Sequence, residues 1–200
     1  MTAEEFATLA DVSRETLARL DAYLTLLRRW QPTLNLVGRS TLRDPWRRHM
    51  WDSAQLRPLI ADRSTVVDLG SGAGFPGLVL AILGGLTVHL VEADQRKVVF
   101  LREAARAAGA EATVHVGRAE ALDPVAGDVV TARALAPVGE LLAWAVRWLR
   151  PGGVCLLLKG RQAEEEVAAA RTRWRFTDER VASRSEPGAA ILRLGDIAHV

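Results

Sequence analysis

The stretch from Val66 to Gly77 (VVDLGSGAGFPG) constrains the fold more than any other part of the chain. Its short β-branched run predicts a buried parallel strand, and the glycines that follow at alternate positions predict a tight turn. Pro76 suits the first turn of a helix, where the N–H that proline lacks would have no partner. Glycines between a strand and a helix let the backbone approach a ligand closely, because no Cβ stands in the way. The segment therefore predicts a site for a cofactor that contains a nucleoside.

A second apolar strand ends in Glu92, about 20 residues after the glycine turn, the spacing of an acid that accepts hydrogen bonds from both ribose hydroxyls. Gly72, Gly74 and Gly77 also match the dinucleotide-binding pattern, which leaves an NAD(P)-binding Rossmann oxidoreductase as an alternative. Asp68 favours S-adenosylmethionine (SAM) over NAD, because a carboxylate beside the turn would repel a pyrophosphate. The same carboxylate would attract the sulfonium and ammonium groups of SAM.

Composition limits the class of protein. The chain has 200 residues, 49% of them hydrophobic, which suits one domain with a sizeable core. No apolar run approaches the roughly 20 residues that cross a bilayer, and the N-terminus lacks the apolar centre of a signal peptide. We therefore expect a cytoplasmic protein without a membrane partner. Cys155 is the single cysteine and lies in an apolar strand pattern, so we expect it in the core and expect no metal site.

Positive charge is concentrated in residues 28–63, which hold eight Arg and three Asp, whereas the whole chain carries a net charge of +2. Trp30, Trp46 and Trp51 lie among these charges, a pattern that predicts a surface for phosphates and unstacked bases. Solvated helix faces in an Arg-rich chain explain the same charges equally well. The candidates for contact with RNA are Arg39, Arg47 and Arg48.

Strands and helices alternate from Thr65 onward, which predicts a parallel sheet covered on both faces. Two further strands around Pro187-Gly188 predict an antiparallel hairpin at the C-terminal end. The expected strands are 65–69, 87–91, 113–116, 128–132, 153–159, 173–181 and 189–195, and the expected helices after residue 64 are 75–84, 95–109, 137–149 and 161–171.

Residues 1–63 predict a helical extension. Thr2 with Glu5 and then Ser13 cap two helices, and Asp44-Pro45 opens another. The expected fold class is α/β, a Rossmann-like class I SAM-dependent methyltransferase with a mainly parallel seven-stranded sheet. We expect the extension, 1–63, to pack on a methyltransferase domain, 64–200, as one globular unit.

Motifs along most of the chain, from about Tyr23 to Arg193, resemble those of one enzyme family. The RsmG (GidB) family consists of small-subunit (16S) ribosomal RNA methyltransferases that modify a guanine at N7. The Gly-Phe-Pro-Gly ending of the glycine turn and the upstream His-x-x-Asp-Ser are the most specific of these motifs. Val37 departs from the pattern, because many members have Thr or Ser after Asn-Leu. The matching segments are Asn35-Leu36, Arg48-His49, Asp52-Ser53, Asp68 to Gly77, Arg96-Lys97, Phe100-Leu101, Arg118 to Glu120, Arg133-Ala134 and Leu158 to Gly160.

The resemblance implies SAM contacts at Gly70, Phe75, Ala119, Glu120 and Arg133. With the residues selected from the strand and turn pattern, the expected cofactor-binding set is Asp68, Gly70, Gly72, Gly74, Phe75, Glu92, Ala119, Glu120 and Arg133. No catalytic residue is identified. Candidates that position the substrate are His49, Asp52, Asn35 and Lys159, although a capping hydrogen bond, a helix contact or a strand-end charge explains them as well.

The missing motifs are also informative. Cys155 is expected in the core, so no thiolate is available for methylation of a cytosine ring carbon, and residues 131–134 lack the Asp/Asn-Pro-Pro-aromatic signature of exocyclic amine methyltransferases. Guanine N7 already carries an in-plane lone pair, so alignment alone can supply much of the rate. We therefore predict methyl transfer from SAM to N7 of one guanine in 16S rRNA, free or within the small subunit or an assembly intermediate, by a monomer. The alternative substrates are a small molecule or a protein.

Overall fold

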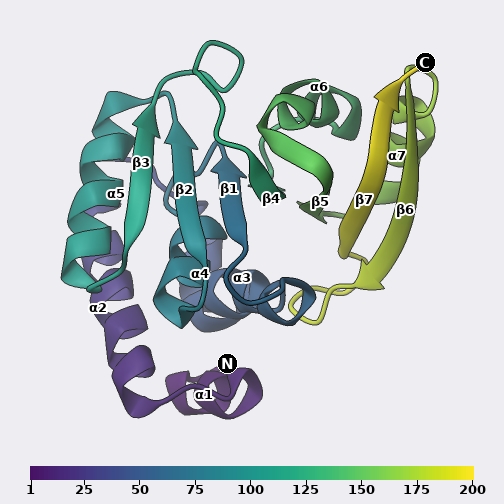
Figure 1. Ribbon diagram of the computed structural model, residues 1–200. Helices are drawn as coiled ribbons and strands as arrows, with labels where there is room; N and C mark the ends of the chain where they lie inside the picture. Colours follow the sequence, from purple (N-terminus) through teal and green to yellow (C-terminus); the bar gives the residue numbers. More distant parts are fainter.

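The computed structural model describes all 200 residues and contains one seven-stranded sheet of order β3-β2-β1-β4-β5-β7-β6 (Figure 1). Strands β1 to β5 pair in parallel, and β7 runs antiparallel to both β5 and β6. The strands are β1 (Thr65–Leu69), β2 (Thr87–Glu92), β3 (Ala112–Val116), β4 (Gly127–Arg133), β5 (Leu149–Lys159), β6 (Trp174–Ala182) and β7 (Ala190–His199). The expected mainly parallel sheet with a C-terminal antiparallel hairpin is confirmed.

Helices cover the two faces of the sheet unequally. One apolar core joins α1, α2, α4 and α5 to one face, whereas α6 and α7 share the second core on the opposite face. None of the helices is long and apolar enough to cross a membrane. The helices are α1 (Ala3–Ala10), α2 (Arg14–Trp30), η1 (Arg39–Arg43), η2 (Trp46–Trp51), α3 (Asp52–Ala54), η3 (Arg57–Leu59), α4 (Gly77–Leu83), α5 (Gln95–Ala107), α6 (Val138–Trp148) and α7 (Ala163–Ala170).

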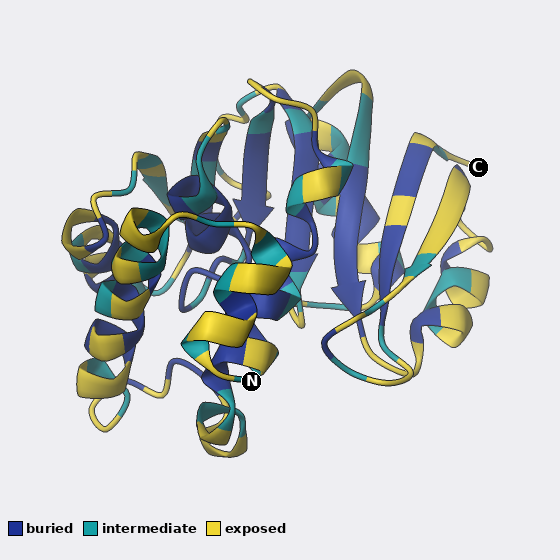
Figure 2. Ribbon diagram, turned by 90° about the horizontal axis from the view of Figure 1, so that it is seen from below, coloured by how far each residue is buried: buried dark blue, intermediate teal, exposed yellow.

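The N-terminal 63 residues share the first core with the sheet. Thr2 forms a capping box with Glu5, and Ser13 caps α2, as the sequence predicts. Tyr23 of α2 is fully buried, and its hydroxyl donates to the Ala73 carbonyl in the glycine turn. Figure 2 shows exposed residues on the outer faces of the helices and buried residues along the central strands, whereas the edge strand β6 is largely exposed. The extension therefore touches the loop that was expected to hold the cofactor.

The segment after Asp44-Pro45 is helical, but its form differs from a regular α-helix. Residues Trp46–Trp51 form a π-helix (η2), which continues into the short α3. The Asp44 carboxylate accepts a hydrogen bond from the Arg47 N–H at 3.3 Å, so Asp44 caps the helix start. This geometry turns His49 and Met50 inward together.

The tryptophans of the basic segment do not form a stacking surface for bases. Trp46 and Trp51 are buried against Phe6, with ring centroids 5.3 and 6.5 Å from it. Trp30 packs edge-on against Phe100 at 5.8 Å. These rings are buried although charged residues surround them in the sequence, because removing a large aromatic ring from contact with water is strongly favourable. The arginines of this segment therefore lie without these rings as a stacking surface beside them.

Helix α4 begins at Gly77, two residues later than the expected start at Phe75. Gly77 packs closely on the sheet. A Cβ at this position would lie 2.4 Å from Leu90 Cδ2 and 2.7 Å from the Cβ of Asp68. Both neighbours belong to buried strands, so α4 would have to move. We expect Gly77→Ala to lower the free energy of unfolding by about 1–3 kcal/mol, measured by urea denaturation. Gly139→Ala in α6 is the control, because its Cβ meets neighbours only at 3.7 Å or more; equal destabilisation of both variants would contradict the packing argument.

Candidate functional site

A cavity of about 630 Å³ runs along the carboxyl ends of β1 to β5, within the size range of ligand sites. On one side the wall consists of the glycine turn after β1 and the residues that follow β2 and β3. On the other side it consists of η1, η2, the end of β5 and the β6–β7 loop, residues 183–189. The parallel sheet brings these segments together, because its strands all end at one edge.

Glu92 and the glycine turn form one end of the cavity. The Glu92 carboxylate accepts hydrogen bonds from the Gly72 and Asp94 N–H groups, both at 2.8 Å, and the side chain is largely buried. Gly70 and Gly72 have positive φ angles of 63° and 57°, which other residues rarely adopt. Each carboxylate oxygen keeps a further lone pair free to accept a hydrogen bond from a ligand.

Asp68 does not line this cavity, which corrects the expectation that its carboxylate faces the cofactor. The side chain is fully buried, with one oxygen accepting from the Thr131 hydroxyl at 2.8 Å and the other from the Gly77 N–H at 3.2 Å. Asp68 therefore joins β1 to β4 and to the start of α4. The preference for SAM over NAD, which was argued from the charge of Asp68, loses this support.

Burial raises the pKa of Asp68 to about 6 from its ordinary value of 3.8, although hydrogen bonds from Thr131 and Gly77 oppose the shift. The folded protein thus binds this proton more tightly than the unfolded chain does. The contribution of Asp68 to the free energy of unfolding is fully present below pH 4. It decreases by about 3 kcal/mol at most as the pH rises to about 6. An asparagine keeps both hydrogen bonds, because its Oδ1 can accept from Gly77 while its Nδ2 donates to Thr131.

We therefore expect the unfolding free energy of the wild type, measured relative to Asp68→Asn, to fall between pH 4 and pH 7. Urea denaturation at several pH values measures this difference. Parallel pH profiles of the two proteins would show that Asp68 is not the titrating group.

Seven of the nine expected cofactor-binding residues line the cavity, and Gly74 joins Asp68 as an exception. A Cβ at Gly74 would lie 2.8 Å from the Tyr23 hydroxyl and 2.9 Å from Leu78 Cβ, so this glycine permits close packing of the turn. The residues that line the cavity are Gly70, Gly72, Phe75, Glu92, Ala119, Glu120 and Arg133.

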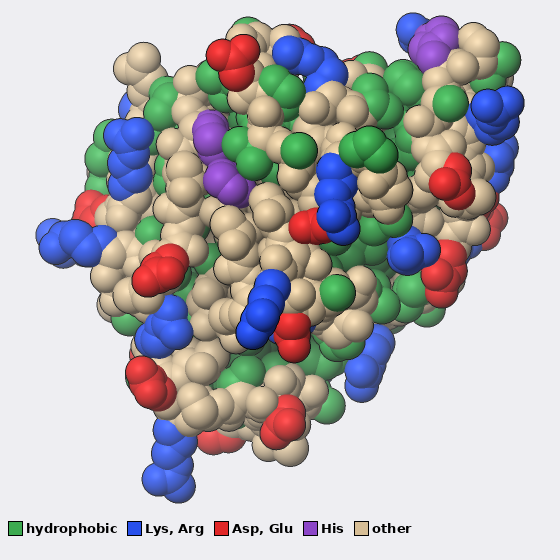
Figure 3. Space-filling view, in the orientation of Figure 1, with side chains coloured by type: hydrophobic (Ala, Val, Ile, Leu, Met, Phe, Trp, Pro, Cys, Tyr) green, Lys and Arg blue, Asp and Glu red, His purple; other side chains and the backbone are tan.

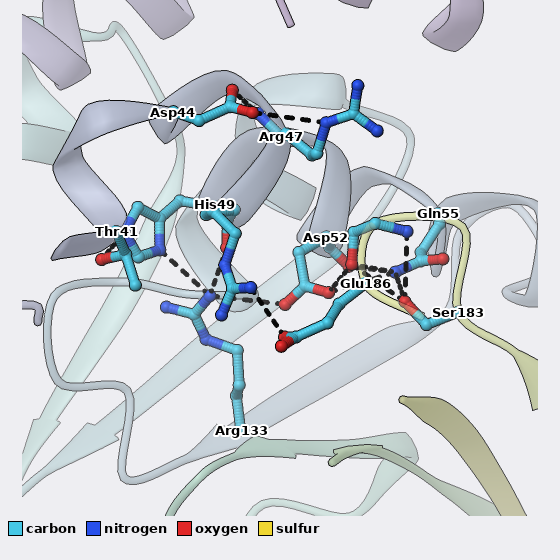
Figure 4. Close-up of polar contacts among 11 residues, drawn as sticks. Thr41, Asp44, Arg47, His49, Asp52, Gln55, Arg133, Ser183 and Glu186 are labelled. Atoms are coloured by element: carbon cyan, nitrogen blue, oxygen red, sulfur yellow. Dashed lines mark hydrogen bonds and ion pairs between the residues drawn. The ribbon is translucent and has the colours of Figure 1, made fainter. Parts of the chain in front are cut away.

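Arg133 joins the end of β4 to the N-terminal extension (Figure 4). One guanidinium nitrogen contacts the Arg48 carbonyl and His49 Nδ1, both at 3.1 Å, and Asp52 Oδ2 at 3.4 Å. The guanidinium also lies over the Phe75 ring, 4.8 Å from its centroid, and His49 stacks on the same ring at 4.8 Å. Arg133 therefore fixes the relative positions of the glycine turn and η2.

His49 is neutral and its two ring nitrogens have different roles. Burial, with Arg133 and Arg48 nearby, lowers the pKa of His49 to about 3. Arg133 can only donate, so Nδ1 accepts and Nε2 carries the proton. That Nε2–H donates to the Thr41 hydroxyl at 2.8 Å, and the hydroxyl in turn donates to the Gly38 carbonyl at 2.6 Å. The imidazole is thus held rigidly and has no nitrogen free to take up a proton.

The β6–β7 loop closes the side of the cavity opposite Glu92. Asp52 accepts hydrogen bonds from the Ser185 hydroxyl and from Gln55, and the Gln55 side chain accepts from the Arg184 N–H at 2.9 Å. Glu186 of the same loop pairs with Arg48 at 2.9 Å. Figure 4 shows Asp52, Gln55, Ser183 and Glu186 converging from the extension and the loop.

The other two positioning candidates differ in location. Lys159 lines the cavity, but its ammonium already donates to Glu166 at 2.7 Å and to the Ala136 carbonyl at 2.5 Å. Asn35 is exposed, accepts a hydrogen bond from Gln31 and does not line the cavity. Sequence reasoning therefore selected one residue too far upstream at Asn35, because Leu36 to Gly38 form the wall.

Several wall residues were missed. Trp144 lines the cavity, whereas Trp148, four residues later in α6, is fully buried. Thr41 had no recognisable pattern, and the β6–β7 loop was predicted only as the turn of a hairpin. Cys155 is buried as predicted, and burial raises the pKa of its thiol to about 12, so no thiolate is available at neutral pH.

Solved structures share the fold at low identity. A TehB-like SAM-dependent methyltransferase from Corynebacterium glutamicum superposes with a TM-score of 0.55 at 15% identity, covering 73% of this chain and 86% of that one. The structure of TYW2 from M. jannaschii in complex with AdoMet superposes with a TM-score of 0.57 at 13% identity, covering 74% of each chain. The expected class I methyltransferase fold is thereby confirmed.

Sequence comparison gives much closer relatives. The ribosomal RNA small subunit methyltransferase G of Rhodospirillum centenum is 56% identical over 197 residues, which cover 98% of this chain and 91% of the relative. The ribosomal RNA small subunit methyltransferase G of Paramagnetospirillum magneticum is 53% identical over 199 residues, which cover 99% of this chain and 97% of the relative. The model of the GidB family, rRNA small subunit methyltransferase G, matches residues 16–190. The chain therefore belongs to the GidB family of rRNA small subunit methyltransferases.

Proposed function

We propose that this protein transfers a methyl group from SAM to N7 of one guanine in small-subunit rRNA. The observation that carries the proposal is a single cavity with two different ends. The glycine turn and Glu92 form one end, and the network of Arg133, His49 and Asp52 forms the other. The protein acts in the cytoplasm as a monomer, on 16S rRNA that is free or in a small subunit or its assembly intermediate.

The glycine-turn end fits SAM. Glu92 would accept hydrogen bonds from the ribose hydroxyls, and the positive-φ Gly70 and Gly72 leave the approach free of side chains. Ala119 and Glu120 after β3 line the wall where the adenine would lie. When bound, SAM supplies an electrophilic methyl group on a sulfonium. SAM rather than NAD is the cofactor, because the chain belongs to a family of methyltransferases.

The residues at the other end of the cavity hold and orient the base. Guanine N7 needs no proton removed, so no general base is required. The neutral His49, with both ring nitrogens engaged, fits a positioning role and cannot act as a base. Arg133 and Asp52 keep the wall rigid around the reacting atoms, which favours a fixed line of approach.

The test is methylation of 16S rRNA from a strain that lacks the corresponding enzyme. Incubation with SAM is followed by cleavage specific for N7-methylguanine, and one new cleavage site is expected. Labelled methyl groups recovered in protein or a small molecule, with none in rRNA, would refute the proposal. A thermal shift with SAM, S-adenosylhomocysteine and NAD separates the cofactors, since a ligand that binds the folded state raises Tm.

Arg39, Arg47 and Arg48 lie on the segment that borders the cavity. Arg39 is exposed and pairs with no carboxylate, whereas the half-exposed Arg47 pairs with Asp44 at 3.3 Å. The face drawn in Figure 3 carries Lys and Arg interspersed with Asp and Glu and has no single basic patch.

We expect Arg39→Gln with Arg47→Gln to weaken rRNA binding and to flatten the dependence of log Kobs on log salt concentration by about one to two. Filter binding at several salt concentrations measures the slope. Arg106→Gln on the outer end of α5 is the matched control. An unchanged slope in the double variant would return these arginines to the role of solvated surface charges.

A further inference from the structure

Four carboxylates line the cavity, and they fall into two pairs by position. Glu92 and Glu120 follow β2 and β3 at the end that fits the cofactor. Asp52 and Glu186 lie on α3 and on the β6–β7 loop, at the end left for the base. Only the second pair is placed to contact the methyl acceptor.

Both carboxylate oxygens of Asp52 already contact other residues of the protein. One oxygen accepts from Ser185 and Gln55, and the other contacts Arg133 at 3.4 Å. Its side chain is 17% exposed. A carboxylate with this many internal donors holds the wall together and has little capacity left for a ligand.

Glu186 has most of its hydrogen-bonding capacity free. Its single side-chain partner is Arg48, which contacts one oxygen at 2.9 Å, and the side chain is 43% exposed. The backbone on which it stands is nevertheless fixed, because the neighbouring Arg184 N–H and Ser185 hydroxyl are bound to Gln55 and Asp52. Glu186 is therefore a carboxylate with free acceptors on an anchored loop.

Guanine offers the complementary donors. Its N7 and O6 lie on one edge, and the N1–H and the 2-amino group lie side by side on the Watson–Crick edge. When N7 meets the methyl group, the Watson–Crick edge stays available to be read by side chains. A carboxylate can accept from both donors at once, whereas adenine would place the lone pair of its N1 against the same charge.

We propose that Glu186 selects guanine by accepting hydrogen bonds from its N1–H and 2-amino groups. This inference rests on the proposed function and goes beyond it, because it assigns base specificity to one residue. Arg48 holds one oxygen of this carboxylate at 2.9 Å, which leaves the other oxygen free to accept.

The test compares guanosine with inosine, which lacks only the 2-amino group, at the mapped target position of 16S rRNA prepared by ligation. Single-turnover methyl transfer is measured with saturating enzyme and SAM. We expect the wild type to modify guanosine about tenfold faster than inosine, the loss expected for one hydrogen bond to a charged group. Glu186→Ala should bring the ratio of the two rates to about one, and Glu186→Gln, which keeps one acceptor, should give an intermediate ratio.

Arg48→Ala is the matched control, since it breaks the same ion pair but leaves the carboxylate. We expect it to lower both rates and to keep the preference for guanosine. A wild-type ratio near one, or an unchanged ratio in Glu186→Ala, overturns the role of Glu186. Failure of the wild type to methylate the guanosine substrate refutes the proposed function instead. Unchanged Tm values show that the variants fold.

Discussion

Replacing Glu92 by alanine is expected to lower the affinity for SAM by at least about a hundredfold. In the proposed complex, the substitution would remove two charge-assisted hydrogen bonds to the ribose hydroxyls, each worth about 1.5–3 kcal/mol. It also leaves the Gly72 and Asp94 N–H groups without their acceptors, both now 2.8 Å from the carboxylate, so the glycine turn loses its support. Isothermal titration with SAM and with S-adenosylhomocysteine measures the loss.

A matched control separates this effect from a general change of charge. Glu111→Ala removes an exposed carboxylate next to β3 and outside the cavity, and it should leave the affinity for SAM as it is. Glu92→Gln keeps one acceptor oxygen and should bind SAM with intermediate affinity. Wild-type affinity in Glu92→Ala would place the ribose elsewhere in the cavity and remove the main support for the proposed cofactor end.

The sequence predicted the sheet well because local patterns determine it. The β-branched run before Gly70, the acid at the end of β2 and the alternation of strands with helices all follow from short-range chemistry. The C-terminal hairpin followed from its turn at Pro187-Gly188 in the same way. Elements of this kind carry their signal within a few residues of the chain.

The position of Asp68 was predictable but was misread. Side chains alternate along a strand, and Val67 and Leu69 belong to the core shared with α6. Asp68 therefore shares the other face with Val66, beneath α4, where it bonds to Gly77. The charge argument ignored this alternation. The burial of Trp46 and Met50 was also predictable, because their spacing of four residues indicates a buried helix face within a basic segment.

The end of the cavity that we propose for the base could not be predicted. Asp52 meets Ser185 across 133 residues of sequence, and Gln55 meets Arg184 across 129. No pattern within either segment indicates the other, because the contact exists only after the sheet has placed β7 beside β5. This is why no motif predicted that the β6–β7 loop, and Glu186 with it, lines the cavity.

Arg133→Met is expected to reduce methyl transfer by about a hundredfold at saturating SAM and rRNA. The wall that we propose to hold the base would lose the contacts to the Arg48 carbonyl, His49 and Asp52. A displacement of about 1 Å costs a rate of this order. At saturating SAM the loss should appear in kcat, because Glu92 keeps its hydrogen bonds to the Gly72 and Asp94 N–H groups. Steady-state kinetics with 16S rRNA measure it.

A second measurement shows whether the rate falls for the stated reason. Arg133 is one of the causes that lower the pKa of His49 to about 3, so its removal should raise that pKa, and NMR titration of the imidazole reports the change. Arg133→Lys keeps the charge but cannot present a planar fork to several acceptors, so it should hold the His49 pKa lower than Arg133→Met does while still losing rate. A full rate with either variant would show that the contacts among Arg133, His49 and Asp52 serve stability and leave the alignment of the base to other residues. If Arg133→Met instead lowers the rate and raises the pKa of His49, then Arg133 is the cause of both the rigid wall and the neutral imidazole.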